Sequence, residues 1–162
     1  GALLIVNDDA RLAGEIGADG VHLGRDDGGV AEARAVVGSE AIIGVSCYDQ
    51  IALAIEARRE GADYVAFGSF FASSVKPHAV RPPISLLAHA RRALGCPIVA
   101  IGGITLERAS GLVSAGADAL AVISDIFDAP DVQSRASAYS QLFGQAPDDI
   151  GNARNDDHDL TQ

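Results

Sequence analysis

The chain has 162 residues, of which 48% are hydrophobic and 21% are charged, and this composition predicts one soluble globular domain. Its net charge of −10 argues against nucleic acids and anionic membrane surfaces as partners. The sequence has neither an apolar run approaching the roughly 18 residues of a membrane-spanning helix nor the basic start of a signal peptide. We therefore expect a cytoplasmic protein in which Cys47 and Cys96 remain buried free thiols.

Short apolar runs rich in Val and Ile alternate along the chain with helix-length segments that have one apolar face. The runs predict strands at Leu3–Val6, Gly20–Gly24, Ile42–Cys47, Tyr64–Gly68, Pro97–Gly102 and Ala119–Ser124. Their nearly continuous apolar character is typical of strands buried on both faces. Helices are expected between them, for example at Ile51–Arg59, and a last helix at Val132–Phe143. This alternation predicts βαβ units and a parallel sheet.

A weak repeat, Gly-Ala-Asp, ends a predicted helix and starts a predicted strand in three places. The copies are Gly17–Asp19, Gly61–Asp63 and Gly116–Asp118. The glycine permits the left-handed turn that stops a helix. The copies recur every second βα unit, a period that suits a closed barrel better than an open sheet. No G-x-G-x-x-G motif follows the first strand, which argues against a dinucleotide-binding fold. The predicted fold is therefore an α/β TIM (β/α) barrel.

Only six of the eight βα units of a complete barrel are recognisable. Because the chain opens with Gly1 and a strand begins at once, we expect the first two units to be missing. The barrel domain is assigned to residues 1–145, and residues 146–162 to an acidic, disordered tail with few apolar residues. An open six-stranded sheet exposes unpaired edges, so we expect this chain alone to be marginally stable or to associate as a homo-oligomer.

Carboxylates follow the first two predicted strands, and strand ends are where parallel barrels place their active sites. Asn7-Asp8-Asp9 comes after the first strand and Gly24-Arg25-Asp26-Asp27 after the second. Oxygen ligands on neighbouring strand ends suit Mg²⁺, which takes one or two carboxylates together with phosphate oxygens and water. Each aspartate alone could equally be a helix N-cap. The pair together favours a metal site.

The remaining strand ends carry groups that can bind phosphate. Ser46 ends the third strand, where it could donate to a phosphate oxygen or simply cap the next helix, the simpler reading for this residue alone. A loop of about sixteen residues follows the fourth strand and carries hydroxyls, Lys76 and Arg81. The fifth strand ends in Gly102-Gly103, whose amides can approach an anion or merely form a tight turn. With the sixth strand end at Ile123–Ser124, they predict a phosphate site.

His22 lies within the second predicted strand, between Val21 and Leu23. We interpret it as a histidine whose hydrogen bonds are satisfied inside the barrel rather than as a catalytic base.

These strand ends, in this order, resemble those of thiamine-phosphate synthases from about Leu3 to Phe143. The blocks that carry the resemblance are Val6–Asp9, Gly20–Asp27, Gly44–Ser46, Gly61–Gly68 with Lys76-Pro77, and Ala100–Thr105. The resemblance implies a transferase of thiamine biosynthesis. It would join 4-amino-2-methyl-5-pyrimidinylmethyl diphosphate to 4-methyl-5-(2-phosphoethyl)thiazole, giving thiamine phosphate and pyrophosphate. Its partners would be these two small molecules.

The resemblance also implies roles for individual residues. Asp8 and Asp27 would hold Mg²⁺. Asn7, Ser46 and Lys76 would grip the pyrophosphate and pyrimidine, with Ser46 and Lys76 taking a direct part in catalysis. The thiazole phosphate would be bound by Ser73, Gly103, Ile123 and Ser124.

The sequence departs from the family pattern in two places. The family usually has glutamine, arginine and lysine after an earlier strand, in a segment absent from this sequence. Val75 stands where the family often has threonine.

Three other functions are compatible with parts of the sequence. A thiazole tautomerase would need a proton-transfer residue after the fourth strand, where Ser69 stands instead of the expected histidine, and it has no use for Mg²⁺. A non-catalytic phosphate-binding barrel would need only the glycine pair and Ser124. A phosphate-sugar isomerase would not need aspartates on two adjacent strand ends. The synthase accounts for the most residues.

Overall fold

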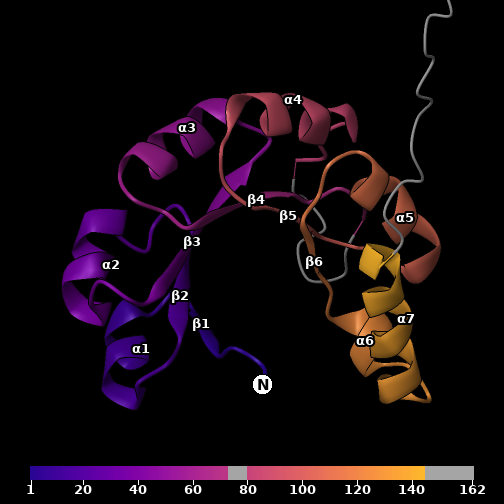
Figure 1. Cartoon of the computed structure of the whole chain (residues 1–162), viewed down its shortest axis with the longest axis horizontal. Helices are drawn as coiled ribbons and strands as arrows, with labels where there is room; N and C mark the ends of the chain where they lie inside the picture. Colours follow the sequence, from indigo (N-terminus) through magenta and orange to yellow (C-terminus); the bar gives the residue numbers. More distant parts are fainter. Residues whose placement is uncertain (73–79, 145–162) are drawn as a thin grey trace, which may run out of the picture.

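The computed structural model describes residues 1–72 and 80–144, and these residues form a curved parallel sheet with helices along its convex side (Figure 1). The strands pair in sequence order: β1 (Ile5–Asn7), β2 (Gly20–Leu23), β3 (Ile42–Tyr48), β4 (Tyr64–Gly68), β5 (Ile98–Ile101) and β6 (Ala119–Ala121). The helices are α1 (Ala10–Ile16), α2 (Val30–Val37), α3 (Ile51–Arg59), α4 (Ser85–Ala93), α5 (Leu106–Ser114), α6 (Ser124–Phe127) and α7 (Val132–Gly144).

All six predicted strands are present, and each pairs with its neighbour in parallel. The architecture is a half-barrel, with β1 and β6 as the two end strands of the described sheet. The α/β prediction is thus confirmed at the level of a barrel-like parallel sheet, whereas the assignment of these units to six of eight stays a prediction. The sixth strand is shorter than predicted because Ser124 begins α6 rather than ending β6.

The hydrophobic core lies between the sheet and the helices. Side chains on the convex face of the central strands, such as Val21, Ile43, Val65 and Ile98, are completely buried. The alternate positions point to the concave face, which the helices do not cover, and larger side chains there, such as His22, Tyr64 and Val99, are only partly buried. Ala66 is buried on this face. The expectation that the strands are buried on both faces is therefore wrong for these larger side chains, which keeps polar groups within reach of a ligand.

Each Gly-Ala-Asp copy joins two neighbouring strands at their N-terminal ends. The glycines at 17, 61 and 116 have positive φ values of 66°, 99° and 114°, as the predicted helix stop requires. The carboxylates of Asp19, Asp63 and Asp118 accept hydrogen bonds from the backbone N–H groups of Leu4, Ile43 and Ile98, at 2.7, 2.8 and 2.8 Å. We call these three bonds the aspartate staples, and they link β1 to β2, β3 to β4, and β5 to β6.

Candidate active site at the carboxyl ends of the strands

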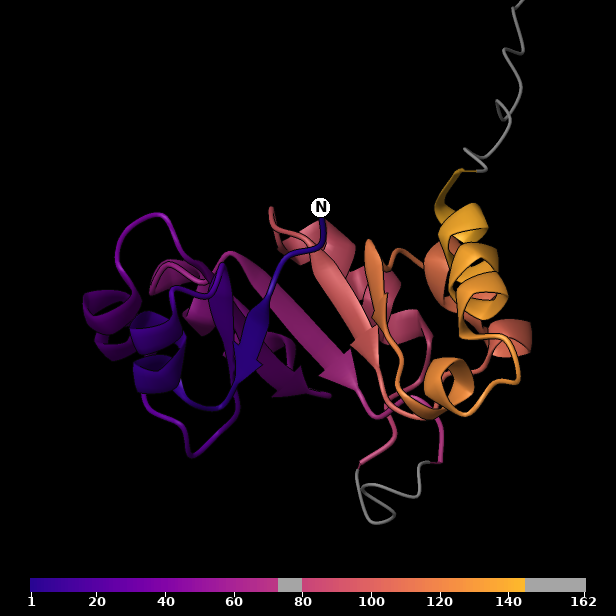
Figure 2. The same cartoon turned by 90° about the horizontal axis from the view of Figure 1, so that it is seen from below.

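All strands of the half-barrel end at the same edge, where their arrowheads point in Figure 2. Asn7 ends β1 at this edge, Asp8 and Asp9 follow it, and all three are exposed. Asp9 is the N-cap of α1, because its carboxylate accepts a hydrogen bond from the Leu12 N–H at 2.9 Å. Asp8 has a left-handed backbone (φ 68°), and its N–H donates to the His22 carbonyl on β2. The capping role thus falls to Asp9 and not to the predicted metal ligand Asp8.

Asp27 lies in the turn after β2, and β2 is the strand that pairs with β1. One of its carboxylate oxygens accepts a hydrogen bond from the Gly24 N–H at 2.7 Å, which holds the turn closed. The N-cap position of α2 is Gly29 instead, so Asp27 is not a helix cap either. Asp8 and Asp27 therefore present carboxylates beyond the ends of two adjacent parallel strands.

The chemistry of these two residues suits a magnesium ion. Two carboxylates are within the number that Mg²⁺ usually takes from a protein, since phosphate oxygens and water complete its shell. Across residues 1–72 and 80–144, the structure contains no group of three or more His, Cys, Asp or Glu side chains that could hold a metal ion by itself. A metal held by Asp8 and Asp27 would take its further ligands from phosphate oxygens and water.

Ser46 occupies an inner position of β3, not a helix cap, since the N-cap of α3 is Gln50. The expectation that Ser46 alone acts as a cap is thus wrong. Its hydroxyl lies 2.9 Å from His22 Nε2, and His22 Nδ1 lies 2.9 Å from the Tyr64 hydroxyl. The interpretation of His22 as a satisfied histidine is confirmed, with its partners on β3 and β4. Tyr64 on β4, His22 on β2 and Ser46 on β3 thus form a hydrogen-bonded row on the concave face, with His22 bonded to both of the others.

Tyr64 fits this row because Gly44 lies opposite it on β3. A Cβ at position 44 would overlap the Tyr64 ring, so only glycine leaves room for the ring to reach His22. Burial raises the pKa of the Tyr64 phenol above its ordinary value, which keeps it protonated at neutral pH. Tyr64 was not predicted from the sequence, although a glycine inside a strand indicates that another group approaches the backbone closely there.

The glycine pair after β5 packs against the chain that leaves β4. Gly102 and Gly103 have positive φ values of 97° and 61°. A Cβ at 102 would overlap Ser69, and one at 103 would overlap the backbone of Phe71 and Ala72. Both glycines are thus required by tight packing as well as by the tight turn that the sequence left open as an alternative, and their backbone lies at the strand-end edge.

α6 follows β6 at the same edge, and Ile123 and Ser124 at its start are exposed. Its residue Asp125, which the sequence analysis did not single out, accepts hydrogen bonds from the Leu106 N–H at the start of α5 and from Tyr139 of α7. The ends of β5 and β6 are therefore connected through one side chain. The predicted binding residues Ser73 and Lys76, as well as Val75, lie outside the described residues.

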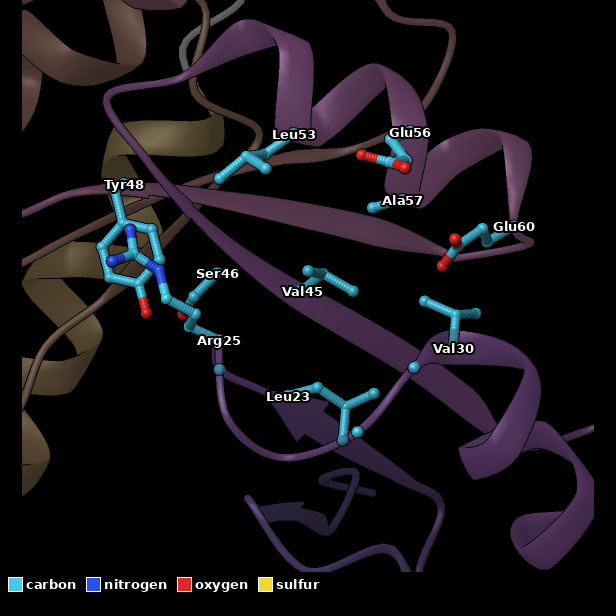
Figure 3. Close-up of a pocket in the computed structure, with 13 residues that line it drawn as sticks. Leu23, Arg25, Val30, Val45, Ser46, Tyr48, Leu53, Glu56, Ala57 and Glu60 are labelled. Carbon is cyan, nitrogen blue, oxygen red and sulfur yellow. The ribbon is translucent and has the colours of Figure 1, made fainter.

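A cavity of about 190 Å³ opens between α2 and α3 on the convex side of β3 (Figure 3). Its apolar walls include Val30, Val45 and Leu53, with Glu56 on α3 and Glu60 directly after that helix. At the strand-end side, the Arg25 guanidinium lies 4.7 Å from the centre of the Tyr48 ring. Ser46 lines this cavity, and so does Gly24, whose N–H donates to Asp27, so the cavity adjoins the turn after β2.

Both cysteines are buried and free, as predicted. Burial, with a smaller contribution from the charge of Cys96, raises the pKa of the Cys47 thiol to about 12. Cys47 is therefore a neutral core residue and not a nucleophile. No helix within the described part of the chain is long and apolar enough to cross a membrane.

Comparison with known proteins identifies the family. The family model for thiamine monophosphate synthase matches residues 1–126. The chain is 62% identical over 143 residues to a thiamine-phosphate synthase of Azoarcus sp. (strain BH72), which covers 88% of this chain and 69% of that relative. It is 54% identical over 149 residues to a thiamine-phosphate synthase of Thiobacillus denitrificans, covering 92% of this chain and 71% of the relative.

A solved structure agrees with the sequence comparisons. Thiamine phosphate pyrophosphorylase from Pyrococcus furiosus superimposes with a TM-score of 0.78 and 32% identity, over 88% of this chain and 68% of that one. The similarity therefore extends through the half-barrel and its strand ends to nearly the whole described chain. On these grounds, the chain belongs to the thiamine monophosphate synthase family.

Proposed function

We propose that this chain is a thiamine-phosphate synthase. It condenses 4-amino-2-methyl-5-pyrimidinylmethyl diphosphate with 4-methyl-5-(2-phosphoethyl)thiazole and releases pyrophosphate, in the cytoplasm. The single observation that carries the proposal beyond family membership is the pair Asp8 and Asp27, which lie at adjacent strand ends and are not helix caps. A thiazole tautomerase or a phosphate-binding barrel without catalysis gives no reason for this pair.

In the proposed site, Asp8 and Asp27 hold Mg²⁺, which supplies positive charge to the pyrophosphate leaving group. Asn7, Ser46 and Lys76 bind the pyrophosphate and the pyrimidine, and Ser73, Gly103, Ile123 and Ser124 bind the thiazole phosphate. The support for Ser46 is its fixed place on the concave face, where His22 orients its hydroxyl. The support for Gly103, Ile123 and Ser124 is that their backbone lies at the same strand-end edge.

In the reaction, the bond between the pyrimidine methylene carbon and the pyrophosphate oxygen breaks, and the electron pair leaves with pyrophosphate. The lone pair of the thiazole nitrogen then forms the new carbon–nitrogen bond. No proton needs to move, so the residues act by stabilising the leaving group and by aligning the nucleophile. Lys76 and Ser46 are proposed to stabilise charge on the leaving group as the first bond breaks.

The test is calorimetric binding of an unreactive analogue of the pyrimidine pyrophosphate, with and without Mg²⁺. We expect binding to depend on Mg²⁺ and to lose that dependence in Asp27→Asn, whose amide oxygen can still accept from the Gly24 N–H. The matched control is Asp26→Asn, the exposed neighbour in the same turn, which should leave binding unchanged. Binding that is indifferent to Mg²⁺ in a folded sample would contradict the assignment of the two aspartates.

A further inference from the structure

Asp125 connects three helices through one carboxylate oxygen. This Oδ2 atom accepts hydrogen bonds from the Leu106 N–H of α5 at 3.2 Å, from Arg135 Nη1 of α7 at 3.3 Å and from the Tyr139 hydroxyl of α7 at 2.8 Å. The Asp125 side chain is only 18% exposed. Hydrogen bonds to an ionised carboxylate are stronger than those between neutral groups, so this junction is one of the firmer polar contacts of the described chain.

The junction matters because α6 has little else to hold it. The helix has four residues, none of which is buried, and its exposed side chains include Phe127. Ile126 contributes only a partly buried contact with the core. A helix this short is not stable by itself, so its position relative to α5 depends on the bonds that Asp125 makes.

Residues of the proposed thiazole phosphate site lie just before or at the start of both helices that Asp125 joins, α5 and α6. Asp125 follows Ile123 and Ser124 directly, and Leu106 is three residues after Gly103. We propose that Asp125 is a positioning residue for the thiazole phosphate, which fixes the end of β6 against the end of β5 so that both can contact one phosphate group. This inference rests on the proposed function, because that function assigns these ends to the phosphate.

The sign of the effect separates positioning from direct electrostatics. A carboxylate next to a phosphate site repels the ligand, so if charge alone mattered, removing Asp125 would tighten binding. Arg135 forms an ion pair with this carboxylate and offsets part of its charge. Tyr139 contributes a neutral donor, and burial together with its bond to Asp125 raises its pKa, so that it stays protonated. Positioning therefore predicts weaker phosphate binding in a variant that has lost a negative charge.

The experiment compares the affinities of the thiazole phosphate and of the same thiazole without its phosphate, by calorimetry on the full chain. In Asp125→Ala we expect the preference for the phosphorylated form to fall about tenfold, the scale of losing hydrogen bonds to a charged group. Tyr139→Phe, which removes one donor and keeps the ring in the core, should give a smaller fall. Affinity for the pyrimidine pyrophosphate should stay unchanged in both variants.

The matched control is Asp131→Ala. The Asp131 carboxylate accepts hydrogen bonds from the N–H and hydroxyl of Ser134 at the start of α7, and its removal should not affect the phosphate preference. An unchanged or increased preference in Asp125→Ala and Tyr139→Phe overturns the positioning role while leaving the proposed function intact. If the unmodified chain shows no preference for the phosphorylated thiazole, the phosphate site of the proposed function fails, and this inference is overturned with it.

Discussion

At the scale of single residues, the orientation of Ser46 depends on two side chains from neighbouring strands. His22 contacts Ser46 through one ring nitrogen and Tyr64 through the other, both at 2.9 Å. A histidine held on both nitrogens has a fixed ring orientation, and the hydrogen bond at one nitrogen sets the role of the other. Tyr64 therefore influences Ser46 without contacting it.

This arrangement predicts the effect of Tyr64→Phe. The variant keeps the ring over Gly44 but removes the hydroxyl that holds His22, so the Ser46 hydroxyl becomes less well oriented. We expect affinity for the pyrimidine pyrophosphate to fall by roughly two- to tenfold, the range for one hydrogen bond. Calorimetry against Tyr48→Phe, whose ring can still stack on Arg25, provides the comparison. Equal affinities in the two variants would show that Tyr64 does not act through His22.

Some residues of the proposed site can be selected from the sequence, and others cannot. The strand ends point to Asp8-Asp9 and Asp26-Asp27 as groups, whereas the choice of Asp8 and Asp27 rests on the family resemblance and stays a prediction. Whether each one caps a helix could not be decided, since that depends on which aspartate faces the first turn. Tyr64 and Asp125 were missed because their partners lie on other strands and helices, and pairing register is not visible in one chain.

At the scale of elements, the aspartate staples add side-chain bonds to the N-terminal ends of the strands, away from the site. Asp63 shows the most extensive case, because its carboxylate also pairs with Arg34 at 2.8 Å. Asp63 accepts its hydrogen bond from the backbone N–H of Ile43, a residue that is fully buried. Asp19 accepts from Leu4, which is 55% exposed, so water can replace this carboxylate more easily.

The difference in burial predicts a graded loss of stability. Asp63→Ala should lower the free energy of unfolding by about 1 to 3 kcal/mol, because it leaves a buried N–H unpaired. Most of this effect comes from the N–H and not from the ion pair, since the Asp63 side chain is 47% exposed. Asp19→Ala should lower the free energy of unfolding by less. Asp49→Ala, which changes an exposed aspartate near the start of α3, should leave it about unchanged. Urea denaturation measures all three, and equal losses for Asp63 and Asp19 would refute this ranking.

Elements were the easiest part to predict, because their signals are local. Apolar runs located all six strands, and the glycines of the repeat marked three helix ends correctly. The helix stop was recognised, but the staple was not, because its acceptor and donor lie on different strands, from 15 to 20 residues apart.

At the scale of the whole molecule, the sheet is open, with β1 and β6 at its ends. Apolar surface accompanies the β6 end, where a cavity of about 410 Å³ is lined by Leu120, Val122 and Phe143 among others. We expect the isolated chain to associate with other copies of itself or to have a low melting temperature, because open edges and apolar surface favour pairing with other chains. Sedimentation and thermal melting test this, and a stable monomer at high concentration would refute it.

Buried Cys47 predicts how the stability of the molecule depends on pH. Its pKa is about 12 in the folded protein and 9.0 when unperturbed, so the unfolded chain loses this proton first as pH rises. Folding stability should therefore decline between about pH 9 and pH 12, and it should decline less in Cys47→Ala. Melting temperatures of both proteins across this range measure the effect, and the difference between the two proteins below about pH 8.5 serves as the reference. Parallel declines in both proteins would argue against Cys47 as the cause.

The aspartate staples also divide the molecule into three two-stranded modules, β1–β2, β3–β4 and β5–β6, each with its own carboxylate bond. Within the described sheet, the β2–β3 and β4–β5 boundaries have no such staple. A circularly permuted chain whose new ends lie at residues 94–96, between α4 and β5, would keep all three modules whole. New ends at residues 60–62 would instead detach the Asp63 turn from its module, so the sheet should tolerate the first rearrangement far better than the second.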